Sequence, residues 1–197
     1  DRNLRDFPSE VRSVMGQALW AAQLGKKHLD AKPLKGFTGA SVLEIVSDYD
    51  TDTYRGVYSV KLAGVVYVLH TFQKKSKHGI QTSKQDMMLI RQRLKAAEQH
   101  YQEHYSGEKA MSTEIKVTPS SGNVFADLGL PNPEEHLVKA TIALSIGELI
   151  EKRGLTQEEA GTILGLSQSS VSNLVRGKLD KFTIDRLMRY MRKLDYD

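Results

Sequence analysis

The sequence predicts an α+β domain, in which helices pack on a small antiparallel sheet, followed by an all-α domain. Two long segments with helical periodicity flank a group of apolar runs rich in Val and Tyr in the first part of the chain. A polar stretch then interrupts this pattern, and helical periodicity returns after it. We therefore expect a first domain at 1–110, a linker or arm at 111–135 and a helical domain at 136–197.

Each element of the first domain has its own signal. Pro8 suits the first turn of a helix and Gly25 suits its end, so we expect a helix over 8–27. Residues 32–39 contain a proline and two glycines and predict a loop. The other expected elements are strands over 42–47, 54–62 and 65–72, a tight hairpin turn at Ala63 and Gly64, and a second long helix over 82–105.

The composition excludes several classes of protein. The chain has 197 residues, of which 40% are hydrophobic and 26% charged, as in ordinary globular proteins. No run approaches the roughly 20 apolar residues of a membrane helix, and no signal peptide is recognised at the start. The absence of cysteine excludes disulfides and cysteine-based zinc sites. We expect a cytoplasmic protein.

Charge is distributed unevenly between the two domains. The net charge of +4 divides into +5 over residues 1–110 and −1 over residues 111–197. A basic first domain suggests a polyanionic partner, and a solvated basic face is the alternative.

Met111 marks the junction, because it opens the polar stretch. It is either the natural start of a second protein joined to the first or an ordinary linker residue. The chain begins at Asp1 rather than Met, so we expect that residues have been trimmed or that others precede it.

Residues 155–178 read LTQEEAGTILGLSQSSVSNLVRGK and predict a helix-turn-helix between helices at 133–150 and 183–194. Thr156 and Glu159 form a capping box at the start of the first motif helix. Gly161 lies where a small side chain is needed, and Gly165 lies at a sharp turn with positive φ. Ser167 caps the second helix and Gly177 ends it.

This pattern resembles the Cro/repressor (XRE) family over residues 145–194. The resemblance implies a five-helix domain, usually dimeric, that reads a palindromic operator. Glutamine pairs with adenine and arginine with guanine in the major groove. The DNA-binding residues by position are Gln157, facing phosphate, and Gln168, Ser169, Ser170, Ser172, Asn173 and Arg176. The alternative is a helix-turn-helix used only for protein contacts.

The basic residues of the first domain gather around the predicted hairpin. One strand carries Arg55 and Tyr58, and the other ends with His70, Lys74 and Lys75. Cations stabilise a pentavalent phosphate, histidine transfers protons and tyrosine stacks on RNA bases. Lys77, His78 and Lys84 extend the patch. The alternatives are a core histidine at position 70, a packing role for Tyr58 and solvated lysines.

The first domain contains YRGVY at 54–58, VVYVLHTFQKKSKHG at 65–79 and then a predicted helix with IRQRL at 90–94. With these segments it resembles the RelE/ParE toxin superfamily, and most of all its HigB-type toxins. The resemblance spans residues 7–105. It implies a ribosome-dependent mRNA endonuclease in which the ribose 2′-OH attacks the adjacent phosphate, with no metal or other cofactor. Catalytic roles then fall to Arg55, His70, Lys74 and Lys75, and RNA binding to Tyr58, Lys77 and Lys84. His100 and His104 share a helix face, and we expect a surface position there rather than a metal site.

The two resemblances reinforce each other, because HigB-type toxins are typically followed by HigA-type antitoxins of the Cro/repressor class. The expected partners are operator DNA, mRNA on the ribosome, the other half of the chain and a second copy bound through the helix-turn-helix half. The antitoxin half would restrain the toxin and repress its own operon. Two alternatives are a single-chain transcription regulator with a basic sensor domain, and a RelE/ParE-fold toxin with a target other than RNA.

Overall fold

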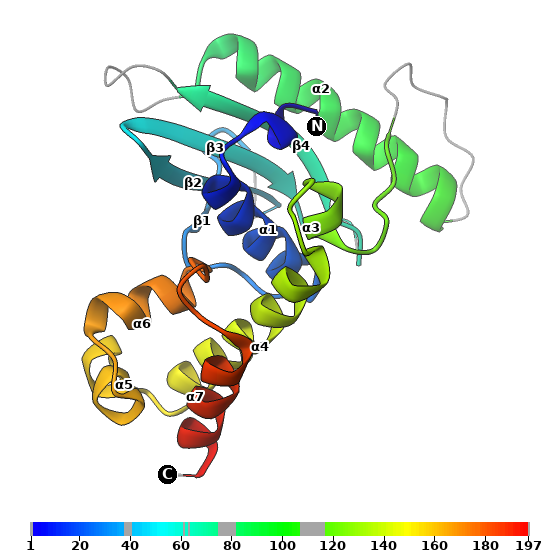
Figure 1. Cartoon of the computed structure of the whole chain (residues 1–197). Coiled ribbons are helices and arrows are strands. Elements are labelled where there is room, and N and C mark those ends of the chain that lie inside the picture. Colours follow the sequence, from blue (N-terminus) through cyan, green and yellow to red (C-terminus); the bar gives the residue numbers. More distant parts are fainter. Residues whose placement is uncertain are drawn as a thin grey trace.

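The computed structural model describes residues 2–37, 41–60, 62, 64–74, 82–106 and 117–196. Figure 1 shows a sheet with helices on both faces, followed by a group of helices that packs beside it. The predicted fold class, α+β followed by all-α, is confirmed. The elements of the first half are η1 (Arg2–Asp6), α1 (Ser9–Gln23), β1 (Ala31–Pro33), β2 (Val42–Tyr49), β3 (Asp52–Ser59), β4 (Tyr67–Lys74), α2 (Lys84–Tyr101) and the π-helical turn η2 (Gln102–Ser106).

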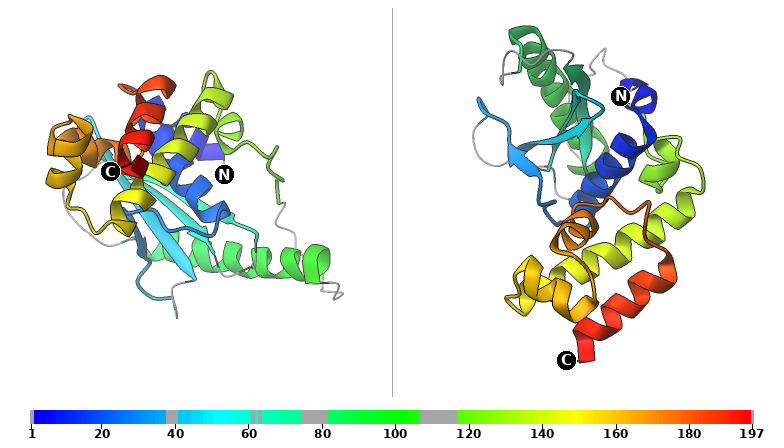
Figure 2. Two further views of the ribbon diagram at one scale, coloured as in Figure 1. Left: turned by 90° about the horizontal axis from the view of Figure 1, so that it is seen from below. Right: turned by 60° about the vertical axis from the view of Figure 1, so that its left-hand side comes forward.

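The four strands form an antiparallel sheet in the order β1-β2-β3-β4. Helix α1 covers one face, where Met15, Ile45 and Tyr58 are buried together. Helix α2 covers the other face through Val57, Leu69 and Ile90. Figure 2 shows α2 on one side of the sheet and α1, with the helical half, on the opposite side. Side chains that alternate along a strand are therefore divided between two separate cores.

One prediction for this half is wrong, and a second holds only in part. Residues 31–33 form an edge strand paired with Leu43–Ile45, although the loop prediction covered residues 32 and 33. Pro33 is tolerated because an edge strand leaves one side of its backbone unpaired. The turn predicted between β3 and β4 holds in part, because the Val65 amide donates to the Leu62 carbonyl at 2.8 Å and the chain turns at 62–65. The connection is longer than a two-residue hairpin loop, since β3 ends at Ser59 and β4 begins at Tyr67. Ala63 itself lies outside the described residues.

The second half contains α3 (Val124–Asp127), α4 (Pro133–Lys152), α5 (Gln157–Leu164), α6 (Gln168–Val175) and α7 (Ile184–Tyr196). The predicted capping box is confirmed, since the Thr156 side chain accepts from the Glu159 amide and the Glu159 carboxylate accepts from the Thr156 amide. Gly165 has a φ of 71°, as the predicted turn requires. Ser167 accepts from the Ser170 amide and begins α6. A buried core that includes Ile146, Leu174 and Leu187 holds α4, α5, α6 and α7 together.

The segment expected to be a polar linker is folded over much of its length. Asn123 caps α3, which is a single turn, and its side chain accepts from the amides of Phe125 and Ala126. Phe125 and Leu128 are buried against α1. From residue 117 onward the segment therefore corresponds to the arm of that prediction rather than to a free linker, because a few apolar side chains in a polar stretch suffice to anchor it to α1. Met111 lies outside the described residues.

No helix in the described ranges is long and apolar enough to span a membrane.

Candidate nucleic-acid interfaces

Arg55, His70 and Lys74 lie on the same face of the sheet. In the β3–β4 register Arg55 is opposite Phe72, Thr53 is opposite Lys74 and Val57 is opposite His70. Because residues two apart share a face, these three side chains all lie on the side that α2 covers. The structure therefore brings together three of the four predicted catalytic residues. Lys75, the fourth, and Lys77 lie outside the described residues.

Arg55 is only 8% exposed and is bound to a carboxylate from the neighbouring strand. Its Nη1 lies 2.6 Å from Glu44 Oε2. In the β2–β3 register Arg55 is opposite Val46, and Glu44 is two residues from Val46 on the same face. The guanidinium charge is therefore balanced within the sheet, and a phosphate that reached Arg55 would have to compete with Glu44.

His70 is also buried and lies between two side chains of α2. Its Nε2 is 3.0 Å from Asp86 Oδ1, and its Nδ1 is 3.4 Å from Nη1 of Arg93. A guanidinium can only donate, so Nδ1 accepts from Arg93 and the ring proton lies on Nε2 toward Asp86. Arg93 is fixed in turn by a 2.8 Å hydrogen bond to the Leu69 carbonyl. The His70 ring stacks on Phe72 with centroids 5.1 Å apart.

The two α2 partners of His70 have pKa values displaced from normal. Burial by itself would raise the pKa of the Asp86 carboxyl, but hydrogen bonds from Ser83 and His70 hold that pKa below its usual value. Burial lowers the pKa of Arg93. Asp86 and Arg93 are two helical turns apart and therefore share a face of α2. The arrangement Asp86–His70–Arg93 orients one imidazole and fixes where its proton lies.

Tyr58 must be removed from the predicted RNA-binding residues. It is 1% exposed and belongs to the core beneath α1, on the opposite face of the sheet from Arg55. The two residues are three apart along β3, and alternation sends them to opposite sides. Burial also raises the pKa of the Tyr58 hydroxyl to about 12. Its ring has no free face for a base. Lys84, by contrast, is exposed at the first turn of α2, and Lys74 is half-buried at the end of β4.

Sequence reasoning missed Glu44, Asp86 and Arg93. For Arg93 a signal was present, because it lies within the quoted IRQRL segment. For Glu44 and Asp86 the sequence carried no such signal. Glu44 meets Arg55 through the strand register, and Asp86 meets His70 through the packing of α2, and no local pattern specifies either contact.

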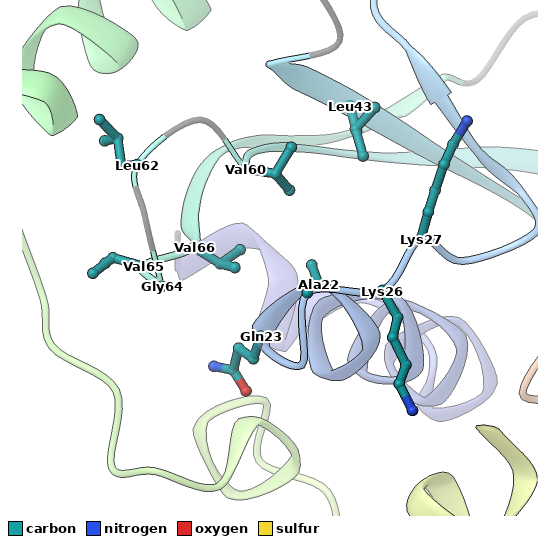
Figure 3. A pocket seen from close by; sticks show the side chains of 11 residues that line it. Ala22, Gln23, Lys26, Lys27, Leu43, Val60, Leu62, Gly64, Val65 and Val66 are labelled. Carbon is teal, nitrogen blue, oxygen red and sulfur yellow. The ribbon is translucent and has the colours of Figure 1, made fainter. Parts of the chain in front are cut away.

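A cavity of about 320 Å³ lies away from this cluster, at the C-terminal end of α1. Figure 3 shows Ala22, Leu43 and Val66 around the hollow, with the long side chains of Lys26 and Lys27 extending away from it. Neither Arg55 nor His70 lines this cavity. This cavity and the basic cluster on the α2 face are thus separate parts of the first domain.

The predicted DNA-binding residues lie on α6 and at the start of α5. Gln168, Ser169 and Asn173 are exposed, whereas Gln157, Ser170, Ser172 and Arg176 are half-buried. Gln168 Nε2 donates to Gln157 Oε1 at 2.7 Å and links the two helices of the motif. Arg176 Nε donates to Ser172 Oγ at 3.2 Å. The Arg176 guanidinium also forms an ion pair with Asp30, which belongs to the first half.

The two halves contact each other along α1. Arg12 Nη1 donates to the carbonyls of Leu128 and Gly129 at 2.7 and 2.9 Å. Trp20 Nε1 donates to Thr141 Oγ1 at 3.2 Å. Helix α1 presents Gly16 to Phe125, and a Cβ at Gly16 would lie 2.6 Å from the Phe125 ring. These contacts place the helices of the second half on the α1 side of the sheet, whereas Val117 packs against the core on the α2 side. Arg55 and His70 lie on the α2 side.

The fold thus defines a small α+β domain with a charged cluster on one face of its sheet. A helix-turn-helix domain follows and packs on the opposite side of that sheet. Residues 2–95 match a family model described as phage-derived protein Gp49-like. Residues 124–197 match a family model described as a helix-turn-helix domain. No curated protein and no solved structure matches the chain. A Gp49-like domain followed by a helix-turn-helix domain fits a toxin–antitoxin module with DNA binding.

Proposed function

We propose that this chain is a toxin–antitoxin module of the HigB and HigA type that acts in the cytoplasm. Its first half cleaves mRNA on the ribosome, and its second half neutralises the first, binds operator DNA as a dimer and represses its own operon. The observation that carries the proposal is the docking of a helix-turn-helix domain on α1 of a Gp49-like domain. The domain that matches the helix-turn-helix model thus lies directly on the domain that matches the Gp49-like model.

The α2 face supplies the groups that the cleavage reaction needs. Attack of a ribose 2′-OH on the adjacent phosphate requires cations for the developing charge and a group that moves a proton. Lys84 is exposed and Lys74 is half-buried at the end of β4, and on this proposal both would contact the phosphate backbone. An RNA phosphate would displace Glu44 from Arg55, and His70 would transfer the proton. Arg93 and Asp86 orient the imidazole for that step.

Neutralisation on this proposal is steric. The second half lies on the α1 side, so it does not cover Arg55, His70 or Lys74. It adds five helices to the side of the domain opposite the cluster, and these exclude the toxin half from the narrow space of the ribosomal mRNA channel. Release of the second half would restore entry without any change in the cluster itself.

A single-chain transcription regulator is the second candidate. It is favoured by the burial of Arg55 and His70, each already paired with a carboxylate, and by the separate cavity at the end of α1. In that case the first half senses a ligand in the cavity and never contacts RNA. The two functions differ in what the first half does when it is produced without the second.

The decisive experiment is to induce residues 1–110 alone in growing cells and to map the 5′ ends of cellular mRNA. We expect growth arrest and new cuts in translated mRNA, both relieved by co-expression of residues 111–197. Arg55→Ala and Lys74→Ala should abolish the cuts. Lys32→Ala, an exposed lysine on β1 at the opposite edge of the sheet, is the matched control and should leave them intact. Normal growth and uncut mRNA, with the fragment soluble and folded, would eliminate the nuclease and favour the regulator.

A further inference from the structure

Asp30 of the first half contacts the end of the recognition helix. It lies in the turn between α1 and β1, and its carboxylate forms an ion pair with the guanidinium of Arg176 at the C-terminal end of α6. The Asp30 side chain is 25% exposed and that of Arg176 is 42% exposed. The turn is itself held in place, because the Asp30 amide donates to His28 Nδ1 at 3.2 Å and the Ala31 amide donates to the His28 carbonyl at 3.0 Å.

The surroundings show that this contact is part of a close interface. Gly177 follows Arg176 with a φ of 73°, and a Cβ there would lie 2.5 Å from Cγ of Gln17 on α1. His28 is 2% exposed and lies against the backbone of Arg176. Lys26 and Glu148 of α4 form a second ion pair nearby, at 2.5 Å. The end of α6 is therefore fixed against the first half by backbone contact as well as by charge.

Arg176 has a special place among the predicted DNA contacts. The other six, at 157, 168, 169, 170, 172 and 173, are glutamines, serines and an asparagine, so Arg176 alone carries a positive charge. Contacts between cations and DNA supply most of the affinity that does not depend on base sequence. Arginine also makes the commonest specific contact to guanine. The second half has a net charge of −1, and the nearest other cations along the chain are the exposed Lys178 and Lys181, which follow α6 and are not among the predicted base contacts.

We propose that Asp30 is a built-in competitor of DNA for Arg176, through which the docked first half weakens operator binding by the recognition helix. A carboxylate in this place satisfies the guanidinium as a phosphate or a guanine edge would. DNA must therefore displace the Asp30 carboxylate before it can bind the Arg176 guanidinium. By reciprocity, DNA that holds Arg176 loosens this end of the interface between the halves. The inference rests on the proposed DNA-binding function of the second half, and it assigns a regulatory residue to the first.

The test compares DNA affinities of full-length variants. The probe is a duplex that the Asp30→Asn protein selects from a random-sequence pool, and affinity is measured by fluorescence anisotropy. Asn keeps the size of the side chain and the backbone amide that binds His28. Asp30→Ala is a second variant that removes the acceptor altogether. Asp50→Asn is the matched control, since Asp50 is an exposed turn residue with a φ of 46° that Asn adopts readily.

We expect Asp30→Asn and Asp30→Ala to raise affinity about fivefold over the unaltered chain, the value of a partly exposed ion pair. Asp50→Asn, which changes the net charge equally, should leave affinity unchanged. In an Arg176→Ala background the Asp30→Asn gain should vanish, because the competitor has lost its target. Thermal unfolding of each variant shows that it is folded.

Three results would overturn the inference. Equal affinity of the unaltered chain and Asp30→Asn would show that Asp30 does not compete, while DNA binding itself would stand. A gain that persists with Arg176→Ala, or that Asp50→Asn reproduces, would assign the effect to overall charge. Failure of the Asp30→Asn protein to select any duplex would remove the DNA-binding function and this inference with it.

Discussion

Replacing Phe125 by Ala should separate the two halves of the chain. The Phe125 ring is 1% exposed, lies against Gly16 of α1 and stacks on His136 with centroids 5.6 Å apart. Removing a buried phenylalanine ring typically costs about 3–5 kcal/mol, which includes the cavity left behind. Since the ring is packed between the halves, most of this loss falls on their association. The dissociation constant should rise by roughly two to three powers of ten.

The assay uses the folded full-length protein with a protease site inserted between residues 107 and 116. After cleavage the halves are held together only by the interface, and size-exclusion chromatography over a dilution series gives their dissociation constant. Val138→Ala on α4 is the control, because that side chain is 44% exposed and its loss should cost little. If the Phe125→Ala halves remain associated with the dissociation constant of the unaltered pair, α3 is not the anchor that its burial indicates.

Three further predictions concern stability. Burial lowers the pKa of His28 from 6.5 to about 4, so the folded state disfavours protonation of this side chain. The free energy of unfolding should therefore be full above pH 6.5 and fall by about 3 kcal/mol as the pH drops toward 4. Urea titrations across this range should show the fall, and in the His28→Gln protein the free energy of unfolding should depend less on pH. Gly161→Ala should destabilise the second half by about 1–3 kcal/mol, because its Cβ would lie 2.6 Å from the Leu166 carbonyl oxygen; an unchanged melting temperature would contradict this. Thr156→Ala should cost about 1 kcal/mol through loss of the capping box, measured by the same melts, with Thr162→Ala as the control on the exposed face of α5.

The helix-turn-helix was predictable almost in full because its signals are local. Thr156, Gly165 and Ser167 each act on backbone groups within a few residues of themselves. These local interactions do not depend on which distant elements pack nearby. The long helices at 9–23 and 84–101 were likewise visible from their apolar spacing. The observed ends of these helices differ from the predicted ends by a few residues, because the position of a helix terminus also depends on the elements that pack against it.

The first domain was less predictable because its pairings are distant in sequence. A three-residue edge strand carries too little pattern to be recognised, and β1 exists only because β2 offers it a partner. Alternation along the predicted strand at 54–62 already places Tyr58 on the face opposite Arg55, so this assignment could have been corrected from the sequence. The site residues Glu44, Asp86 and Arg93 come from three elements, and their proximity follows from sheet register and helix docking.

The sequence by itself thus determined the local chemistry: the two classes of domain, the caps and turns of the helix-turn-helix, and the basic residues that end the β-hairpin. Only the tertiary structure decided which partners those residues have. It paired Arg55 with Glu44, oriented His70 between Asp86 and Arg93, and placed Asp30 on Arg176 across 146 positions of the chain. The physical reason is that backbone geometry is set by neighbours in sequence, whereas the pairing of a buried charge is set by whichever element packs against it.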